Sequence, residues 1–259
     1  MKRRVISAVI ALSVCVPIIY VGDIYFKLLV IILAALGLRE FLKINDSPNG
    51  IKLVSFISSM MIVYSNLDSK SFTNIFDINM VSIIFLIFCF LALLYHKTYT
   101  VDGTFKTLGY TLFLSLGFSL FPIIRNMSLP LFVYLFSITI FNDTFAHAIG
   151  TIIGRHKVNE ISPNKSYEGY IGGIILGVIL STVMYLIVVN PYASILKITF
   201  ITLVLSIVGH LGDLFFSQIK RNHNIKDSSN IMPGHGGILD RLDSIILVML
   251  AFVYFSKLL

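Results

Sequence analysis

A short polar passage separates two long apolar runs near the C-terminus: Ser217-Gln-Ile-Lys220-Arg221-Asn-His-Asn-Ile-Lys226-Asp227, and then Pro233-Gly-His235-Gly-Gly-Ile-Leu-Asp240-Arg241-Leu-Asp243. Charged residues crowd this passage, although they make up only 13% of the whole chain. The flanking runs, 198–217 and 244–256, are typical of membrane-spanning helices. A dense cluster of mixed charge between two spans indicates chemistry at a membrane surface.

The composition is that of an integral membrane protein. Hydrophobic residues make up 56% of the chain, and the mean hydropathy is +0.89. Because no long polar stretch leaves room for a soluble domain, we expect one membrane domain over residues 1–259. Within it, 1–140 would supply the N-terminal spans, and 141–259 the C-terminal spans with the catalytic loops. Cys15 and Cys89 lie far apart in apolar runs, which indicates neither a disulfide nor a metal-binding cysteine pair.

The hydropathy pattern predicts an all-α, polytopic membrane protein with about nine transmembrane helices. The predicted spans are 5–21, 24–38, 51–65, 78–95, 108–122, 129–146, 170–189, 198–217 and 244–256. Several of them are shorter than the roughly 20 residues that a straight span needs, so we expect some to be tilted, broken or re-entrant.

The basic residues predict the orientation of these spans. With the N-terminus in the cytoplasm, 15 of the 20 Lys and Arg residues fall on the cytoplasmic side. Both long polar loops, 150–168 and 218–240, then face the cytoplasm, where nucleotides are available. An eight-span arrangement would place one of these loops outside. The net charge of +7 is therefore a consequence of membrane topology, and no nucleic-acid partner is expected.

A potential catalytic face lies at the end of the eighth span. Helical spacing places four polar residues on one face: Asp213, Ser217, Lys220 and Arg221. A carboxylate at this depth usually faces a polar cavity or a charged partner. A purely structural ion pair between Asp213 and Lys220 or Arg221 is the alternative.

Two further carboxylates, Asp240 and Asp243, enter the last span directly after a glycine turn. Acidic residues favour a helix N-terminus, which could account for one of them. Carboxylates without cysteine ligands suit a hard cation such as Mg²⁺. His235 could move a proton or bind phosphate, and a structural hydrogen-bonding role for it is equally compatible with the sequence.

Basic residues around these carboxylates could bind phosphate groups. Lys220, Arg221, Lys226 and Arg241 could alternatively anchor the loop to anionic lipid. Together with metal-binding carboxylates and a glycine turn, however, they match the needs of phosphoryl-type transfer. The segment 142–169 adds a second group of candidates: Asn142, Asp143, Ser162, Lys165 and Glu168. Its glycines at 169, 173 and 177 favour close helix packing.

Together these segments resemble the phosphatidate cytidylyltransferase family, also called CDP-diacylglycerol synthases. The C-terminal signature of that family is met by Ser217, Ile219, Lys220, Arg221, Lys226, Asp227, His235, Gly236, Gly237, Ile238, Asp240, Arg241, Leu242 and Asp243. Its middle motifs are met by Asn142, Asp143, Thr144, Ala146, Gly154, Arg155, Ser162, Pro163, Lys165, Glu168 and Gly169. The chain departs from the family at His147, Asn164, Ser166 and Met232, and only Asn164 removes a charge.

The resemblance implies transfer of CMP from CTP to phosphatidate at the cytoplasmic face of the cell membrane, with Mg²⁺ as cofactor. It also implies a paired-metal centre, in which Asp213 and Asp240 would be the ligands by position. The catalytic residues would be Asp213, Asp240, Asp243, Lys226, Asp227 and His235. The substrate-binding residues would be Ser217, Lys220, Arg221, Arg241, Asn142, Asp143, Ser162, Lys165 and Glu168.

Two alternatives to this function stay open. A transporter would explain Asp143 and Asp213 near spans, but it would place polar residues at the bilayer midplane rather than at one face. A related enzyme acting on another lipid phosphate, or a lipid kinase, would share the same signature. A homodimer is compatible with the chain, although no residue indicates one.

Overall fold

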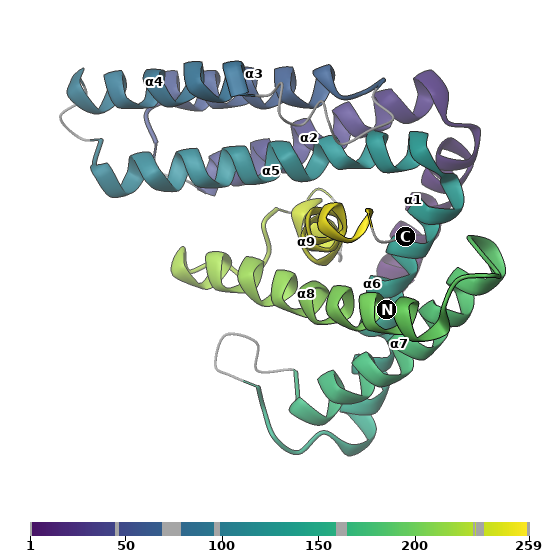
Figure 1. Ribbon diagram of the computed structural model, residues 1–259. Coiled ribbons are helices and arrows are strands. Elements are labelled where there is room, and N and C mark those ends of the chain that lie inside the picture. The colour runs from purple at the N-terminus through teal and green to yellow at the C-terminus, as the bar shows by residue number, and fades with distance from the viewer. Residues whose placement is uncertain are drawn as a thin grey trace. The chain divides into compact units, whose positions relative to one another are not determined.

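The computed structural model describes residues 2–44, 47–68, 79–95, 99–158, 165–229, 231 and 236–257. Within these residues the regular structure is helical, with one isolated bridge between Lys157 and Ser166 (Figure 1). The helices in the described ranges are α1 (Lys2–Val21), α2 (Asp23–Ile44), α3 (Asn49–Ser65), α4 (Asn79–Tyr95), α5 (Val101–Met127), α6 (Leu129–Ile153), α7 (Tyr167–Val188), α8 (Ile195–Asn222) and α9 (Leu239–Phe255). The all-α fold class is therefore confirmed.

Four of these helices are long and apolar enough to cross a membrane: α5, α6, α7 and α8. Two shorter apolar stretches, Leu12–Val21 and Val81–Tyr95, lie in α1 and α4. The chain is thus a multi-pass membrane protein. Each predicted span coincides with a described helix, but nine crossings and a cytoplasmic N-terminus stay predictions.

The predicted spans are often too short at their polar ends. The prediction ends the second span at residue 38, whereas α2 continues to Ile44 through Arg39 and Glu40. The fifth span was predicted as 108–122, whereas α5 has 27 residues. Hydropathy counts charged residues as outside a span, but backbone hydrogen bonding continues a helix through them.

The chain divides into two compact units, and each has its own packing. Unit 1 comprises 1–127 together with 227–241, and unit 2 comprises 128–226 together with 242–259. The chain crosses from one unit to the other three times, and the last crossing lies within α9. The single membrane domain predicted for 1–259 stays a prediction.

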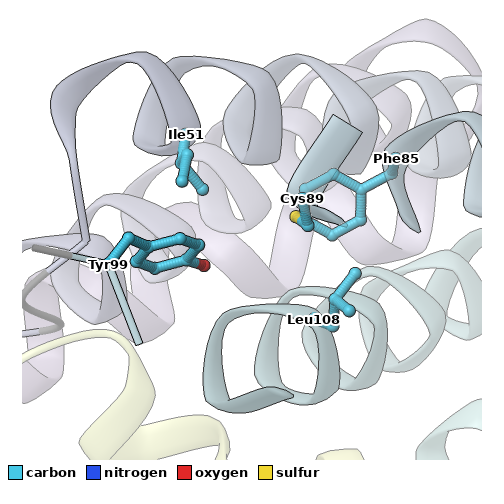
Figure 2. Close-up of a cluster of buried hydrophobic side chains, with 5 residues drawn as sticks. All are labelled: Ile51, Phe85, Cys89, Tyr99 and Leu108. Atoms are coloured by element: carbon cyan, nitrogen blue, oxygen red, sulfur yellow. The ribbon is translucent and has the colours of Figure 1, made fainter. Parts of the chain in front are cut away.

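Unit 1 packs helices α2 to α5 side by side (Figure 1). One of its apolar clusters joins residues from α3, α4 and α5 and from the turn before α5 (Figure 2): Ile51, Phe85, Cys89, Tyr99 and Leu108. Cys89 is buried in this cluster, and Cys15 and Cys89 are both free cysteines.

Polar side chains also join the helices of unit 1. Ser115 donates a hydrogen bond to Ser59 at 2.7 Å, which links α5 to α3. Arg125 donates from Nε to the Ile19 carbonyl at 3.2 Å, and from Nη2 to the Tyr20 carbonyl at 3.0 Å. In an apolar environment polar groups need such internal partners, and these bonds hold α5 to its neighbours.

Unit 2 is built on the close pair α6 and α7, with α8 packed against both. Glycines of α7 make the approach possible, as predicted from their four-residue spacing. A Cβ atom added at Gly173 would lie 2.8 Å from both the Asn142 carbonyl oxygen and the Ala146 Cβ atom of α6. At Gly169 it would lie 2.7 Å from the Ala146 carbonyl oxygen. The backbones of α6 and α7 are therefore in contact.

We predict that Gly173→Ala destabilises the protein. The added methyl group meets backbone rather than a flexible side chain, so we expect a cost of about 1–3 kcal/mol from overpacking. The control is Gly109→Ala in α5, where nothing lies within 4 Å of the added Cβ atom. That change should be neutral or stabilising, because alanine favours a helix by about 0.5–1 kcal/mol over glycine. Thermal unfolding in detergent compares the two, and equal melting temperatures would contradict the close packing.

Candidate active site

A cluster of charged residues in unit 2 brings together several residues singled out in the sequence. Its centre is Lys165, which forms an ion pair with Asp213 of α8. Asp143 of α6 and Asp243 of α9 interact electrostatically with the same lysine, and Lys220 of α8 interacts with Asp243. Three carboxylates and two ammonium groups from four segments of the chain thus meet in one region.

The loop before α7 holds Lys165 in place through its backbone. Val158 donates its N–H to the Lys165 carbonyl at 3.1 Å, and Tyr167 donates to the His156 carbonyl at 2.9 Å. Ser166 then caps α7 by accepting a hydrogen bond from the Gly169 N–H at 3.2 Å. Lys165 therefore lies immediately before the N-cap residue of α7, with its ammonium 5.6 Å from the centre of the Tyr170 ring.

Burial lowers the pKa of the Lys165 ammonium, and the carboxylates of Asp143 and Asp243 act in the opposite direction. The Lys165 side chain is 31% exposed, and that of its partner Asp213 is 15% exposed. Both side chains are thus largely shielded from water. A charge in such an environment needs a partner of opposite charge. An anionic phosphate group could compete with Asp213 for the ammonium.

Gly212 brings α8 close to the start of α9, within unit 2. A Cβ atom at this position would lie 2.8 Å from the Asp243 carbonyl oxygen and 3.2 Å from the Ser244 Cα atom. Asp243 in turn accepts a hydrogen bond from the Ser244 N–H at 2.7 Å. The Gly212-Asp213 pair therefore combines a close backbone contact with the carboxylate that reaches Lys165.

Two buried polar atoms beside this cluster have no hydrogen-bond partner: the Tyr170 hydroxyl and His210 Nε2. The two rings lie 4.5 Å apart, centre to centre, and His210 is only 6% exposed. Neither residue was predicted from the sequence, since both lie inside apolar runs. The one available signal was that His210 lies three residues before Asp213, on the same side of α8.

Two predicted substrate-binding residues make structural contacts. Asn142 is 2% exposed and donates to the Ser206 carbonyl at 3.2 Å, while the Ser206 hydroxyl donates to its Oδ1 at 2.9 Å. Glu168 accepts hydrogen bonds from the N–H groups of Arg155 and His156, and it also contacts the His156 ring. Asn142 thus links α6 to α8, and Glu168 closes the loop before α7.

Asp240 belongs to unit 1, at the start of α9. Its Oδ2 accepts hydrogen bonds from the N–H groups of Ser228 and Gly237, each at 2.8 Å, and its Oδ1 accepts one from the Ser228 hydroxyl at 3.0 Å. Glu40 of α2 contacts the same segment, and the sequence analysis missed it. The last span was predicted to start at 244, whereas α9 begins five residues earlier, at Leu239.

The other predicted site residues lie at the surface or outside the described part. Lys226, Asp227 and Arg241 are exposed, and Ser217 is partly exposed. Arg221 is also exposed, and it donates to the Ile225 carbonyl at 3.1 Å. Ser162 and His235 lie outside the described residues, so their predicted roles stay predictions.

Comparison with known proteins identifies the family. The sequence profile described as "Cytidylyltransferase family" matches residues 2–259. The chain belongs to the cytidylyltransferase family. A protein of Bacillus subtilis named phosphatidate cytidylyltransferase is 36% identical over 271 residues, covering 98% of this chain and 97% of its own. Proteins of the same name from Staphylococcus haemolyticus and Staphylococcus aureus are each 35% identical over 256 residues, covering 96% of both chains.

The carboxylates of the charged cluster in unit 2 are of the donor type that suits a magnesium ion. Carboxylate oxygens are the ligands that Mg²⁺ prefers, and Asp213 already holds a positive charge in the form of the Lys165 ammonium. In unit 1, the N–H groups of Ser228 and Gly237 already occupy both lone pairs of Asp240 Oδ2. Within the described ranges, no group of three or more His, Cys, Asp or Glu side chains is preassembled for a metal.

We predict that Asn142→Ala destabilises the protein by about 1–3 kcal/mol, because it leaves buried polar groups of Ser206 unsatisfied. In a double-mutant cycle, the effects of Asn142→Ala and Ser206→Ala on the free energy of unfolding should be strongly non-additive. Thr151→Ala, at an exposed position of the same helix, is the control. Thermal unfolding in detergent measures the wild type, the two single variants, the double variant and the control. A loss of substrate affinity with unchanged thermal stability would instead favour the substrate-binding role predicted for Asn142.

Proposed function

We propose that this protein is a phosphatidate cytidylyltransferase, which converts CTP and phosphatidate to CDP-diacylglycerol and pyrophosphate. The observation that carries this proposal is the full-length similarity to proteins of that name, at 35–36% identity over at least 96% of the chain. The charged cluster around Lys165 in a multi-pass membrane protein supports it, because both substrates carry phosphate groups and one of them is a lipid.

The reaction forms one bond and breaks another at the same phosphorus atom. A phosphate oxygen of phosphatidate attacks the α-phosphorus of CTP, and the bond from that phosphorus to the bridging oxygen breaks. Pyrophosphate leaves with the electron pair. No proton has to be removed from the attacking oxygen when it is already ionised, so the protein's main tasks are alignment and charge stabilisation.

The charged residues predicted from the sequence would serve these tasks. Lys165 and Lys220 would bind phosphate oxygens, because their ammonium groups already interact with carboxylates of the cluster. Asp213 and Asp240 are proposed as magnesium ligands, the latter on the family resemblance alone. Mg²⁺, when bound, would neutralise charge on the phosphate oxygens. Ser217 and Arg221 near the end of α8, Lys226 in the loop that follows it, and Arg241 in α9 are proposed to bind the substrates.

The proposal also places the reaction at the cytoplasmic side of the cell membrane. The distribution of basic residues in the sequence supports this orientation, since CTP is available on that side. The homodimer stays a prediction.

A substrate panel tests the function. We expect purified protein with Mg²⁺ and phosphatidate to release pyrophosphate from CTP at least about tenfold faster than from ATP, a discrimination within the reach of one polar pocket. A diacyl phosphate and a prenyl-ether phosphate should be compared as acceptors, with product identified by mass spectrometry. Activity without preference for cytidine would overturn the nucleotide assignment. Faster reaction of the ether lipid would point to the related enzyme, and substrate uptake into proteoliposomes without any lipid product would point to a transporter.

We predict that Asp213→Asn lowers kcat by about 100-fold or more. The substitution removes the negative charge that binds Lys165 and that would also bind a magnesium ion. Asp102→Asn is the control: that carboxylate pairs with Lys106 at the surface of α5 and is 75% exposed. Its replacement should change kcat by less than about twofold, as expected for an exposed ion pair. Pyrophosphate release at saturating CTP gives both values. Full activity of Asp213→Asn would exclude Asp213 from the site.

A further inference from the structure

We propose that Glu40 is a positioning residue for the cytidylyl transfer: its buried carboxylate fixes the backbone before α9 and thereby the orientation of Asp240. This inference rests on the proposed function. All the residues that it involves belong to unit 1, which includes α2 and the segment 227–241.

Glu40 lies on α2, and it contacts residues almost 200 positions later in the chain. Its Oε1 accepts hydrogen bonds from the Ile238 N–H at 2.9 Å and from the Ser229 hydroxyl at 2.6 Å. Its Oε2 accepts one from the Leu239 N–H at 3.0 Å. The residue is only 3% exposed, so these donors replace the water that a carboxylate would otherwise bind.

Glu40 and Asp240 together satisfy three successive backbone N–H groups. Asp240 accepts from Gly237, and Glu40 accepts from Ile238 and Leu239. The first N–H groups of a helix have no partner within the helix, and the helix dipole favours negative charge there. Glu40 therefore caps the first N–H group of α9, at Leu239, and the two carboxylates together hold the two residues that precede the helix. Because both bind adjacent peptide groups, a shift of one displaces the other.

The two glycines before α9 make room for these carboxylates. Gly236 has a φ of +83°, which few other residues adopt, and a Cβ atom there would lie 2.6 Å from Asp240 Oδ2. A Cβ atom at Gly237 would lie 2.6 Å from Glu40 Oε1 and 2.7 Å from its Cδ atom. The glycine turn noted in the sequence therefore brings the backbone of unit 1 against Glu40 and Asp240.

A glutamine cannot replace Glu40 without loss. Both carboxylate oxygens accept a backbone N–H, so the amide NH₂ of a glutamine would face an N–H group in either orientation. An aspartate keeps the charge but is shorter by one methylene group, so it would restore part of the contact. The order of activity should therefore be Glu40, then Asp, then Gln.

The experiment compares Glu40→Gln and Glu40→Asp in the full-length protein, with CTP, phosphatidate and Mg²⁺. We expect Glu40→Gln to lower kcat by at least about tenfold, because the orientation of Asp240 is no longer fixed. The KM of CTP should change little. Glu40→Asp should recover part of kcat. Lys43→Gln, an exposed change on the same helix, is the control and should leave kcat unchanged.

Hydrogen exchange separates this inference from the proposed function. Peptides that cover 228–241 should exchange faster in Glu40→Gln than in the wild type, because the Ile238 and Leu239 N–H groups lose their acceptors. This readout does not depend on activity. If the wild type makes no CDP-diacylglycerol, the proposed function fails while faster exchange still supports the Glu40 contacts. Unchanged exchange, or a lower melting temperature with unchanged kcat of the folded enzyme, would overturn the positioning role.

Discussion

Carboxylates inside an apolar helical protein need a cation or hydrogen-bond donors, and the arrangement of the polar residues follows from this need. In unit 2, Lys165 comes out of the loop before α7 to meet Asp213. In unit 1, backbone N–H groups before α9 turn toward Glu40 and Asp240. The two solutions differ in kind. An ammonium group can exchange its carboxylate for a phosphate, whereas backbone N–H groups hold a fixed geometry. The first suits substrate binding, and the second suits support of the site.

The sequence was informative about helices wherever apolar runs were long. The polar passage between 217 and 243 correctly separated α8 from α9. The last span was nevertheless predicted to start at 244, whereas α9 begins at Leu239 and includes both Asp240 and Asp243 in its first turns. The ends of α2 and α5 were not predictable in this way. Arg39 is exposed and Glu40 is buried on the same helix, and hydropathy treats both as the end of a span. Only tertiary contacts distinguish a charge that leaves the membrane domain from one that is paired within it.

For the candidate site, local spacing predicted neighbours along one helix but not partners across helices. Asp213 was expected to pair with Lys220 or Arg221 if it paired at all, and its partner is Lys165, which comes from a different segment. Asn142 matched the family motif and was expected at the substrate, yet its amide binds Ser206 in the interior. Glu40 and His210 carry no motif that a single sequence reveals. Their surroundings are assembled by contacts between distant parts of the chain.

The backbone contact between α6 and α7 also limits how the protein can move. Gly169 and Gly173 leave no layer of side chains between the two helices at these positions, so one helix cannot slide or tilt against the other without a steric clash. The pair therefore acts as a rigid frame for Asp143 on α6 and for Lys165 just before α7. Any conformational change that accompanies substrate entry or product release must then take place outside this frame, in α8 or in the segments that connect the helices.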